Sequence, residues 1–261
     1  MTDLIVDNLS VTAGDASLVQ NASFALRPGE LVVLLGPNGA GKTSLLRGAI
    51  GLTPVQNGKA TLGENDTATL PPQTRARQLS YLPQARPLAW PIRVADVVAL
   101  GRFAHGAALS KMNETDQAAV DAAIADCSLT HLVDRRTDTL SGGELARVHF
   151  ARALAATTPM LIADEPIAAL DPRHQFGIMD IIAAYVQRGN GALVVLHDIA
   201  IAARYATRLI WMQSGKIIAD GTVKQTLTSE RIADVYGIQA RVTDETVQLL
   251  GPATPPEMSP G

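Results

Sequence analysis

Residues 31–50 read LVVLLGPNGAGKTSLLRGAI, which is an apolar run, a glycine-rich turn and a helix-forming segment in direct succession. The turn at residues 36–43 has the glycine, lysine and hydroxyl spacing of a P-loop, set between a strand and a helix as that motif requires. Its glycines let the backbone approach a ligand, so that N–H groups of residues 39–43 surround phosphate oxygens at a helix N-terminus. The pattern therefore predicts a nucleotide phosphate site rather than a turn that only caps a helix.

Two side chains of this loop are expected to complete the phosphate site. Lys42 adds a positive charge, and the Thr43 hydroxyl is suited to holding Mg²⁺. A P-loop site also needs an acidic residue at the end of a neighbouring strand, and MLIADEP at residues 160–166 supplies Asp164. Such a carboxylate on its own could be a turn or helix cap, but beside a P-loop we interpret it as a Mg²⁺ partner.

Glu165 follows Asp164 and is the candidate to orient or deprotonate an attacking water near the γ-phosphate. General-base help of this kind is worth roughly 10² to 10⁴ in rate. His197 closes the next apolar run, ALVVLHD, where it could hydrogen-bond the γ-phosphate or that water. A lone histidine at a strand end is more often structural, so both interpretations of His197 stay open at this point.

Other short runs rich in Val, Ile and Leu predict further strands, at residues 160–163, 192–196 and 208–212. Their apolarity is continuous and helical segments separate several of them, which favours a mainly parallel sheet covered on both faces. The runs at 4–12 and 18–27 flank turn residues 13–15 and predict an antiparallel N-terminal layer. The expected fold class is α/β, with a P-loop NTPase core.

Between about residue 94 and residue 156 the pattern changes to Ala-rich helical segments without a convincing strand. This change predicts an α-helical subdomain inserted into the core, within a single ATPase domain that spans residues 1–250. Residues 251–261 read GPATPPEMSPG and offer little to bury, so a flexible tail is expected there.

Composition excludes several classes of protein. The 261 residues are 47% hydrophobic with a formal net charge of −3, which is typical of a folded chain with no overall attraction to nucleic acid. The single cysteine, Cys127, allows no internal disulfide. No stretch approaches the roughly 20 apolar residues of a membrane-spanning helix, and the acidic N-terminus is unlike a signal peptide. We expect a cytoplasmic protein that binds no nucleic acid.

LSGGE at residues 140–144 opens a predicted helix and precedes Asp164 in the chain. Together with GPNGAGKT, Gln84 in SYLPQ, IADEP, the ALD ending at Asp171 and His197, it resembles the ATP-binding cassette of ABC transporters over about residues 3–245. The resemblance implies ATP and Mg²⁺ as ligands and ATP hydrolysis as the activity. It implies that Gln84 senses Mg²⁺ and the nucleotide, although alone it would be read as a loop residue.

The resemblance also assigns each site residue a role. The implied catalytic residues are Glu165, His197, Lys42 and Gln84, and the implied metal ligands are Thr43, Gln84 and Asp164. The implied nucleotide-binding residues are Gly36, Pro37, Asn38, Gly39, Ala40, Gly41, Lys42, Thr43, Ser44, Ser141, Gly142, Gly143, Glu144 and Asp171.

In this family two cassettes face each other head to tail, and each ATP lies between one subunit's P-loop and the other's signature helix. Ser141, Gly142 and Gly143 suit that second position because a helix N-terminus offers backbone N–H groups to an anion. The implied partners are a second copy of the chain, integral membrane permease subunits and, indirectly, a substrate-binding protein. The implied location is the cytoplasmic face of the inner membrane, as a peripheral subunit.

Weaker matches narrow the class of transporter. PLAWPIRVADVVALGR, LDPRHQ and ADVYGIQARV resemble the ATPases of importers for ferric siderophores, haem and cobalamin. Trp90 lies in the region that resembles the surface where a permease docks, although a tryptophan there could also close the local core. Three positions depart from the family pattern: Ala13 stands where an aromatic residue stacks on adenine, and Leu145 and Ala146 replace glutamines of the signature.

Other functions remain open from the sequence. An importer of zinc or manganese and an exporter cassette both share these ATP motifs. A soluble ABC protein acting on DNA or ribosomes is disfavoured, because the chain has one P-loop, one cysteine and no sustained heptads. A regulatory nucleotide switch that hydrolyses too slowly to drive transport would differ in its turnover with the permease present.

Overall fold

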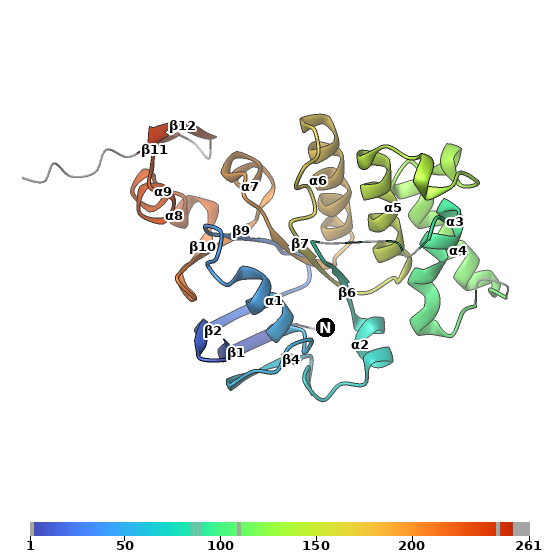
Figure 1. Ribbon diagram of the computed structural model, residues 1–261, viewed down its shortest axis with the longest axis horizontal. Coiled ribbons are helices and arrows are strands. Elements are labelled where there is room, and N and C mark those ends of the chain that lie inside the picture. The colour runs from blue at the N-terminus through green and yellow to red at the C-terminus, as the bar shows by residue number, and fades with distance from the viewer. Residues whose placement is uncertain are drawn as a thin grey trace, which may run out of the picture.

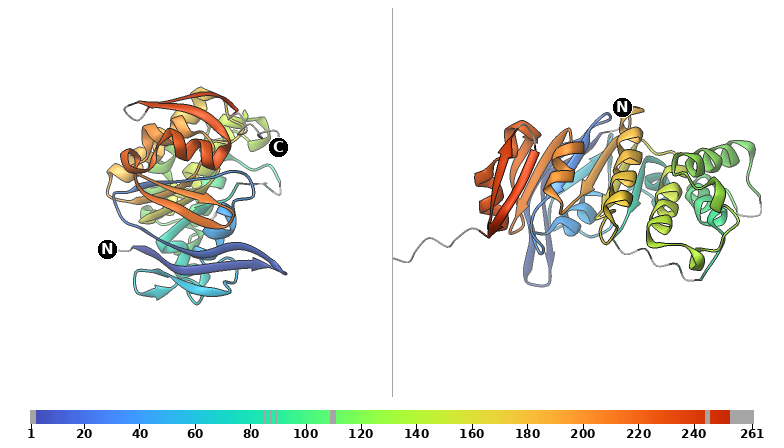
Figure 2. Two further views of the ribbon diagram at one scale, coloured as in Figure 1. Left: turned by 90° about the vertical axis from the view of Figure 1, so that its left-hand side faces the viewer. Right: turned by 90° about the horizontal axis from the view of Figure 1, so that it is seen from above.

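The computed structural model describes residues 3–84, 86, 88, 90–108, 111–243 and 246–252. The described residues form three sheets of six, four and two strands, with helices around them (Figure 1). Figure 2 shows the helical region and the two-stranded C-terminal hairpin at opposite ends of the long axis. Within the described part of the chain, no helix combines the length and the apolar composition needed to cross a membrane.

A six-stranded sheet carries the functional residues at its strand ends. Its order is β10-β9-β3-β8-β7-β6, and all neighbouring strands are parallel except β10 and β9. Every residue of β3, β7 and β8 is buried, which is why these strands are apolar without alternation. The mainly parallel sheet is confirmed. The bounds are β3 Leu31–Leu35, β6 Leu79–Leu82, β7 Met160–Asp164, β8 Gly191–Val195, β9 Arg208–Gln213 and β10 Lys216–Thr222.

An antiparallel layer lies beside this sheet, and a helix fills the space between them (Figure 1). The layer has the order β2-β1-β4-β5, as the N-terminal sequence pattern predicted for its first two strands. The helix, α1, contributes Leu45 and Leu46 to an apolar core shared with both sheets. The bounds are β1 Leu4–Ala13, β2 Ala16–Leu26, α1 Lys42–Ala49, β4 Asn57–Leu62, β5 Asn65–Asp66 and α2 Pro72–Gln78.

Helices cover the opposite face of the six-stranded sheet and extend beyond its β6 edge (Figure 1). The described residues between 94 and 156 form helices and no strand, which confirms the predicted helical insertion. A second apolar core, which includes Phe150 and Trp211, joins these helices to the sheet. The bounds are α3 Val94–Ala99, η1 Leu100–His105, α4 Glu114–Asp126, η2 Thr130–Leu132, η3 Thr137–Thr139, α5 Gly142–Ala155, α6 Pro172–Gln187 and α7 Ile199–Tyr205.

The C-terminal part differs from the sequence prediction. Two short helices lead into a two-stranded antiparallel hairpin whose second strand ends at Pro252. The expected tail is therefore wrong for residues 251 and 252, which pair with residues 239 and 238 of the hairpin. Residues 253–261 lie outside the described residues. The bounds are α8 Val223–Thr226, α9 Ser229–Tyr236, β11 Ile238–Thr243 and β12 Thr246–Pro252.

Candidate functional site

The P-loop connects β3 to α1 through glycines in backbone conformations that other residues rarely adopt. The φ angles of Gly36, Gly39 and Gly41 are 155°, 79° and 95°. A Cβ atom on Gly36 would lie 2.2 Å from the carbonyl oxygen of Met212, and one on Gly41 would lie 2.2 Å from that of Leu18. The loop can therefore take this path only with glycine at both tight positions.

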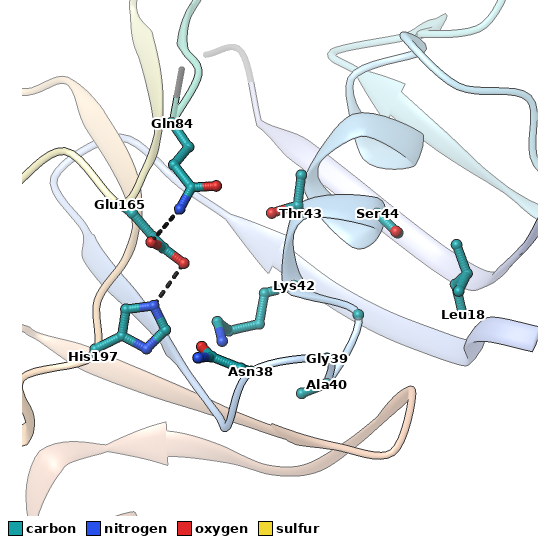
Figure 3. A pocket seen from close by; sticks show the side chains of 11 residues that line it. Leu18, Asn38, Gly39, Ala40, Lys42, Thr43, Ser44, Gln84, Glu165 and His197 are labelled. Carbon is teal, nitrogen blue, oxygen red and sulfur yellow. Dashed lines mark hydrogen bonds and ion pairs between the residues drawn. The ribbon is translucent and has the colours of Figure 1, made fainter. Parts of the chain in front are cut away.

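The P-loop forms one wall of an open cavity of about 800 Å³ (Figure 3). Its other wall comes from the ends of β6, β7 and β8, so the segments around residues 84, 165 and 197 meet residues 38–44 across the cavity. This is the strand edge at which open α/β sheets bind ligands. The lining residues are Leu18, Asn38, Gly39, Ala40, Gly41, Lys42, Thr43, Ser44, Gln84, Glu165 and His197.

Lys42 is held across the base of its own loop. Its ammonium donates hydrogen bonds to the carbonyl oxygens of Gly36, at 2.7 Å, and Pro37, at 2.9 Å. Burial lowers the pKa of Lys42, while the nearby carboxylates of Glu165 and Asp164 raise it. These two hydrogen bonds fix the position of the Lys42 ammonium beside the loop. From there its positive charge would attract a bound phosphate.

Glu165 is the centre of the hydrogen-bonded group opposite the P-loop. The amide of Gln84 donates to its Oε2 atom at 2.6 Å, and Nε2 of His197 lies 2.6 Å from its Oε1 atom (Figure 3). The backbone of Glu165 has a φ of 49°, in the left-handed region that costs a non-glycine residue energy. This turn directs Glu165 into the cavity, whereas Asp164 ends strand β7 below it.

Asp164 is 1% exposed, and both of its carboxylate oxygens lack a hydrogen-bond partner of standard geometry among the described residues. Burial raises its pKa, and the nearby Thr43 hydroxyl opposes that shift by favouring the charged form. Two buried carboxylate oxygens and a hydroxyl are donors that suit Mg²⁺. Among the described residues, no three His, Cys, Asp or Glu side chains lie close enough together to hold a metal ion. A cation here would therefore also need oxygen atoms from a bound nucleotide or from water.

The signature residues lie elsewhere on the chain. Ser141 caps α5 by accepting from the Glu144 N–H, and the Glu144 carboxylate accepts from the Ser141 N–H at 2.8 Å in return. A Cβ on Gly142 would meet nothing within 4 Å, whereas one on Gly143 would overlap His174. None of these residues, nor Asp171, which caps α6, lines the cavity described above. Figure 1 shows α5 well separated from α1.

Comparison with known proteins agrees with the geometry. The sequence model of the family described as "ABC transporter" matches residues 19–168, from strand β2 to just beyond Glu165. This chain belongs to the ABC transporter family. It is an ATPase of that family, since the P-loop, the acidic strand end and the signature helix all fall within the matched range.

Relatives of this ABC ATPase match it over nearly its full length. The hemin import ATP-binding protein HmuV of Pseudomonas entomophila is 38% identical over 92% of this chain and 94% of its own. The structure of MJ1267, an ATP-binding cassette of an ABC transporter in its ADP conformation, has a TM-score of 0.81 and 25% identity, covering 90% and 98%. The dimeric structure of MJ0796, a bacterial ABC transporter cassette, shares the fold with a TM-score of 0.72 and 24% identity, covering 84% and 98%.

Two contacts of the ABC ATPase's site were missed by the sequence analysis. Leu18 of β2 lines the cavity, whereas Ala13, expected near the adenine, ends strand β1 and does not line it. The hydroxyl of Tyr236 accepts a hydrogen bond from the N–H of Gly36 at 2.9 Å. Leu18 lies in a run that the sequence marks only as a strand. Tyr236 is 200 residues from Gly36, so no local pattern relates the two.

Trp90 of the ABC ATPase is 69% exposed. The alternative in which it closes the local core is therefore wrong. Its surface position is compatible with a docking role, which stays a prediction. Residues 85, 87 and 89 of the same segment lie outside the described residues.

Proposed function

We propose that this chain is the ATP-hydrolysing subunit of a membrane importer whose substrate is haem or a chemically related iron or cobalt chelate. The observation that carries the proposal is the close relation to a protein named for hemin import, over nine tenths of both chains. Siderophores and cobalamin remain within the same class of importer. We further propose that the chain through the end of β12 at Pro252 acts as one ATPase domain.

The chain's own groups account for hydrolysis as follows. The N–H groups of residues 39–43 and the ammonium of Lys42 bind the phosphates. Glu165 accepts a proton from water while the water oxygen forms a bond to the γ-phosphorus and the bond from that phosphorus to the β–γ bridging oxygen breaks. ADP and inorganic phosphate result. The two oxygens of Glu165 contact Gln84 and His197, and each can still accept a further hydrogen bond, so the attacking water can bind beside these contacts.

The donor set described above fits Mg²⁺. Thr43, Asp164 and Gln84 would hold the ion, and when bound it neutralises charge on the terminal phosphates. The support for this assignment is that the buried oxygens of Asp164 have no hydrogen-bond partner of standard geometry in the part of the chain that the structure describes, which is costly for a carboxylate.

The second half of the ATP site is proposed to come from another copy of the chain. Ser141, Gly142 and Gly143 do not reach the cavity within one chain, yet the N-terminus of α5 has N–H groups directed away from the helix. Gly142 has open space around its α-carbon, which leaves room for a ligand to approach. A head-to-tail dimer would bring this helix end onto the γ-phosphate and make closure depend on ATP.

The partners proposed for the dimer are permease subunits in the membrane and, through them, a substrate-binding protein. The chain would then lie on the cytoplasmic face of the inner membrane as a peripheral subunit. Exposed Trp90 is the support for a docking surface on this chain. Replacing Trp90 with Ala should weaken association with the permease while folding and ATP binding are retained.

The decisive experiment removes the gene and measures growth on defined iron sources. Loss of growth on haem with normal growth on ferric siderophores supports the haem assignment. Loss of growth on a ferric siderophore alone would assign a siderophore as the substrate instead of haem. Normal growth on every iron source, with cobalamin uptake also unchanged, would refute the importer function. In membranes containing the permease, the purified chain should hydrolyse ATP with a rate that the substrate-loaded binding protein stimulates.

A further inference from the structure

The last helix of the fold touches the first residue of the P-loop. Tyr236 ends α9, and its hydroxyl oxygen accepts a hydrogen bond from the Gly36 N–H at 2.9 Å. Gly36 directly follows β3 and begins the turn that leads to the phosphate-binding N–H groups. The contact joins residues that are 200 positions apart in the sequence, and Tyr236 lies outside the residues that the family model matches.

The ring of Tyr236 is fixed by its surroundings. It packs edge-on against Trp211, with ring centroids 6.3 Å apart at an angle of 71°. Trp211 is fully buried in β9 and pairs with Leu35, the residue before Gly36. Gly237 follows as the C-cap of α9, with a φ of 68° in the left-handed region that favours glycine. The hydroxyl is therefore placed by the packing of its ring and by the end of its helix.

Both polar backbone groups of Gly36 are consequently engaged by side chains. Its carbonyl oxygen accepts from Lys42 at 2.7 Å, and its N–H donates to Tyr236. The neighbouring carbonyl of Met212 leaves no room for a side chain at this position. Burial raises the pKa of Tyr236 to about 12, against a smaller opposing effect of the Gly36 N–H, so the phenol is neutral at physiological pH.

We propose that Tyr236 is a positioning residue for the nucleotide site. By accepting from Gly36 it holds the start of the P-loop in the conformation that the phosphates need, before any nucleotide is present. Ordering the loop in advance lowers the conformational cost that ATP binding would otherwise carry. Tyr236 does not line the cavity, and its effect is on affinity through the loop. The inference rests on the proposed role of the P-loop in binding ATP.

The variant Tyr236→Phe removes the acceptor and keeps the ring against Trp211. We expect the KM for ATP to rise about 2- to 12-fold, the range for one net hydrogen bond, with kcat changed less than about twofold. In nucleotide-free protein, hydrogen exchange at the Gly36 amide should become faster by a similar factor. The matched control is Tyr185→Phe, because Tyr185 is also a buried phenol and donates to Thr158, away from the cavity.

Exchange at Gly36 should be unchanged in the control, as should the KM for ATP. The proposal is overturned if Tyr236→Phe leaves Gly36 exchange at the wild-type rate, if exchange rises uniformly along the chain, or if the KM stays constant while Gly36 exchange accelerates. Because exchange is measured without nucleotide, it is independent of the ATPase proposal. A wild-type chain that consumes no ATP would refute that function, and with it the affinity role, even if the Gly36 contact behaves as described.

Discussion

The Nε2 atom of His197 lies 2.6 Å from the Oε1 atom of Glu165, at the end of neighbouring strands β8 and β7. With Gln84 on the other oxygen, both carboxylate oxygens of Glu165 have a partner. The two partners come from segments on opposite sides of Glu165 in the sequence. The contact favours the interpretation of His197 as part of the site over a merely structural strand-end histidine.

Glu165→Gln is expected to lower kcat for ATP hydrolysis by roughly 10² to 10⁴, because an amide cannot accept the proton of the attacking water. ATP binding should persist, and the variant should accumulate as a closed dimer in ATP and Mg²⁺. Phosphate release and size-exclusion chromatography measure the two effects. Glu64→Gln, at an exposed turn, is the control and should behave as wild type. Turnover near the wild-type rate in Glu165→Gln would exclude the assigned role.

Mixed dimers test whether the two halves of the ATP site come from different chains. Lys42→Ala and Ser141→Arg should each abolish hydrolysis in a homodimer. In a dimer of one chain of each kind, one site combines the intact P-loop of the Ser141→Arg chain with the intact signature of the Lys42→Ala chain. We expect isolated heterodimers, which have one intact site of two, to hydrolyse ATP at up to half of the wild-type rate. Absence of any restoration, with heterodimers demonstrated by pull-down, would contradict a functional composite site.

Ala13→Tyr is expected to tighten ATP binding. An aromatic pair is worth roughly 0.5 to 1.5 kcal/mol, which corresponds to an affinity gain of about 2- to 12-fold. Ala13 is exposed at the end of β1, so the larger side chain meets no packing obstacle. Thr12→Tyr is the control, because neighbouring residues of a strand point to opposite faces. Equal ATP affinities in Ala13→Tyr and wild type, measured by calorimetry, would mean that Leu18 or another group already covers the base.

His149 is expected to make the chain sensitive to acid. It is 3% exposed on α5, and burial lowers its pKa to about 4, with Arg152 and Arg86 adding to the shift. In the unfolded chain the pKa returns to about 6.5, so below that pH the unfolded state binds a proton that the folded state does not. Stability from this group is therefore complete above pH 6.5 and falls by up to about 3 kcal/mol as the pH approaches 4.

The test compares wild type with His149→Leu by urea denaturation between pH 7.5 and pH 4, a range set by these two pKa values. The free energy of unfolding of the variant, relative to wild type, should improve progressively as the pH falls, since the variant lacks the proton uptake. His131→Gln removes an exposed histidine and should follow the wild-type profile. Parallel profiles for wild type and His149→Leu would rule out a titrating, desolvated imidazole at this position.

The sequence predicted the parts of the fold that depend on short-range pattern. Buried parallel strands are apolar throughout, so β3, β7 and β8 were recognisable, and the glycine spacing of the P-loop follows from the steric contacts at Gly36 and Gly41. The strands β11 and β12 were missed because none of their residues is fully buried, so neither strand has the continuous apolar run that marks β3, β7 and β8.

Parts of the candidate site could not be predicted from the sequence, for a different reason. The separation of Ser141 from the cavity, the place of Leu18 beside the P-loop and the contact of Tyr236 with Gly36 all depend on how distant segments pack. Motif order indicates which residues act together but not which chain supplies them. Long-range packing, rather than local propensity, sets these relationships.

The bond between Tyr236 and Gly36 also sets the minimum length of a chain in which the first amide of the P-loop keeps its acceptor. A shortened protein that ends after the matched family region, or anywhere before α9, would keep every residue of the recognised motifs and still leave the opening amide of its phosphate cradle without its acceptor. A truncation before α9 should therefore lower the affinity for ATP. A recombinant cassette intended for binding studies should retain the chain through Gly237.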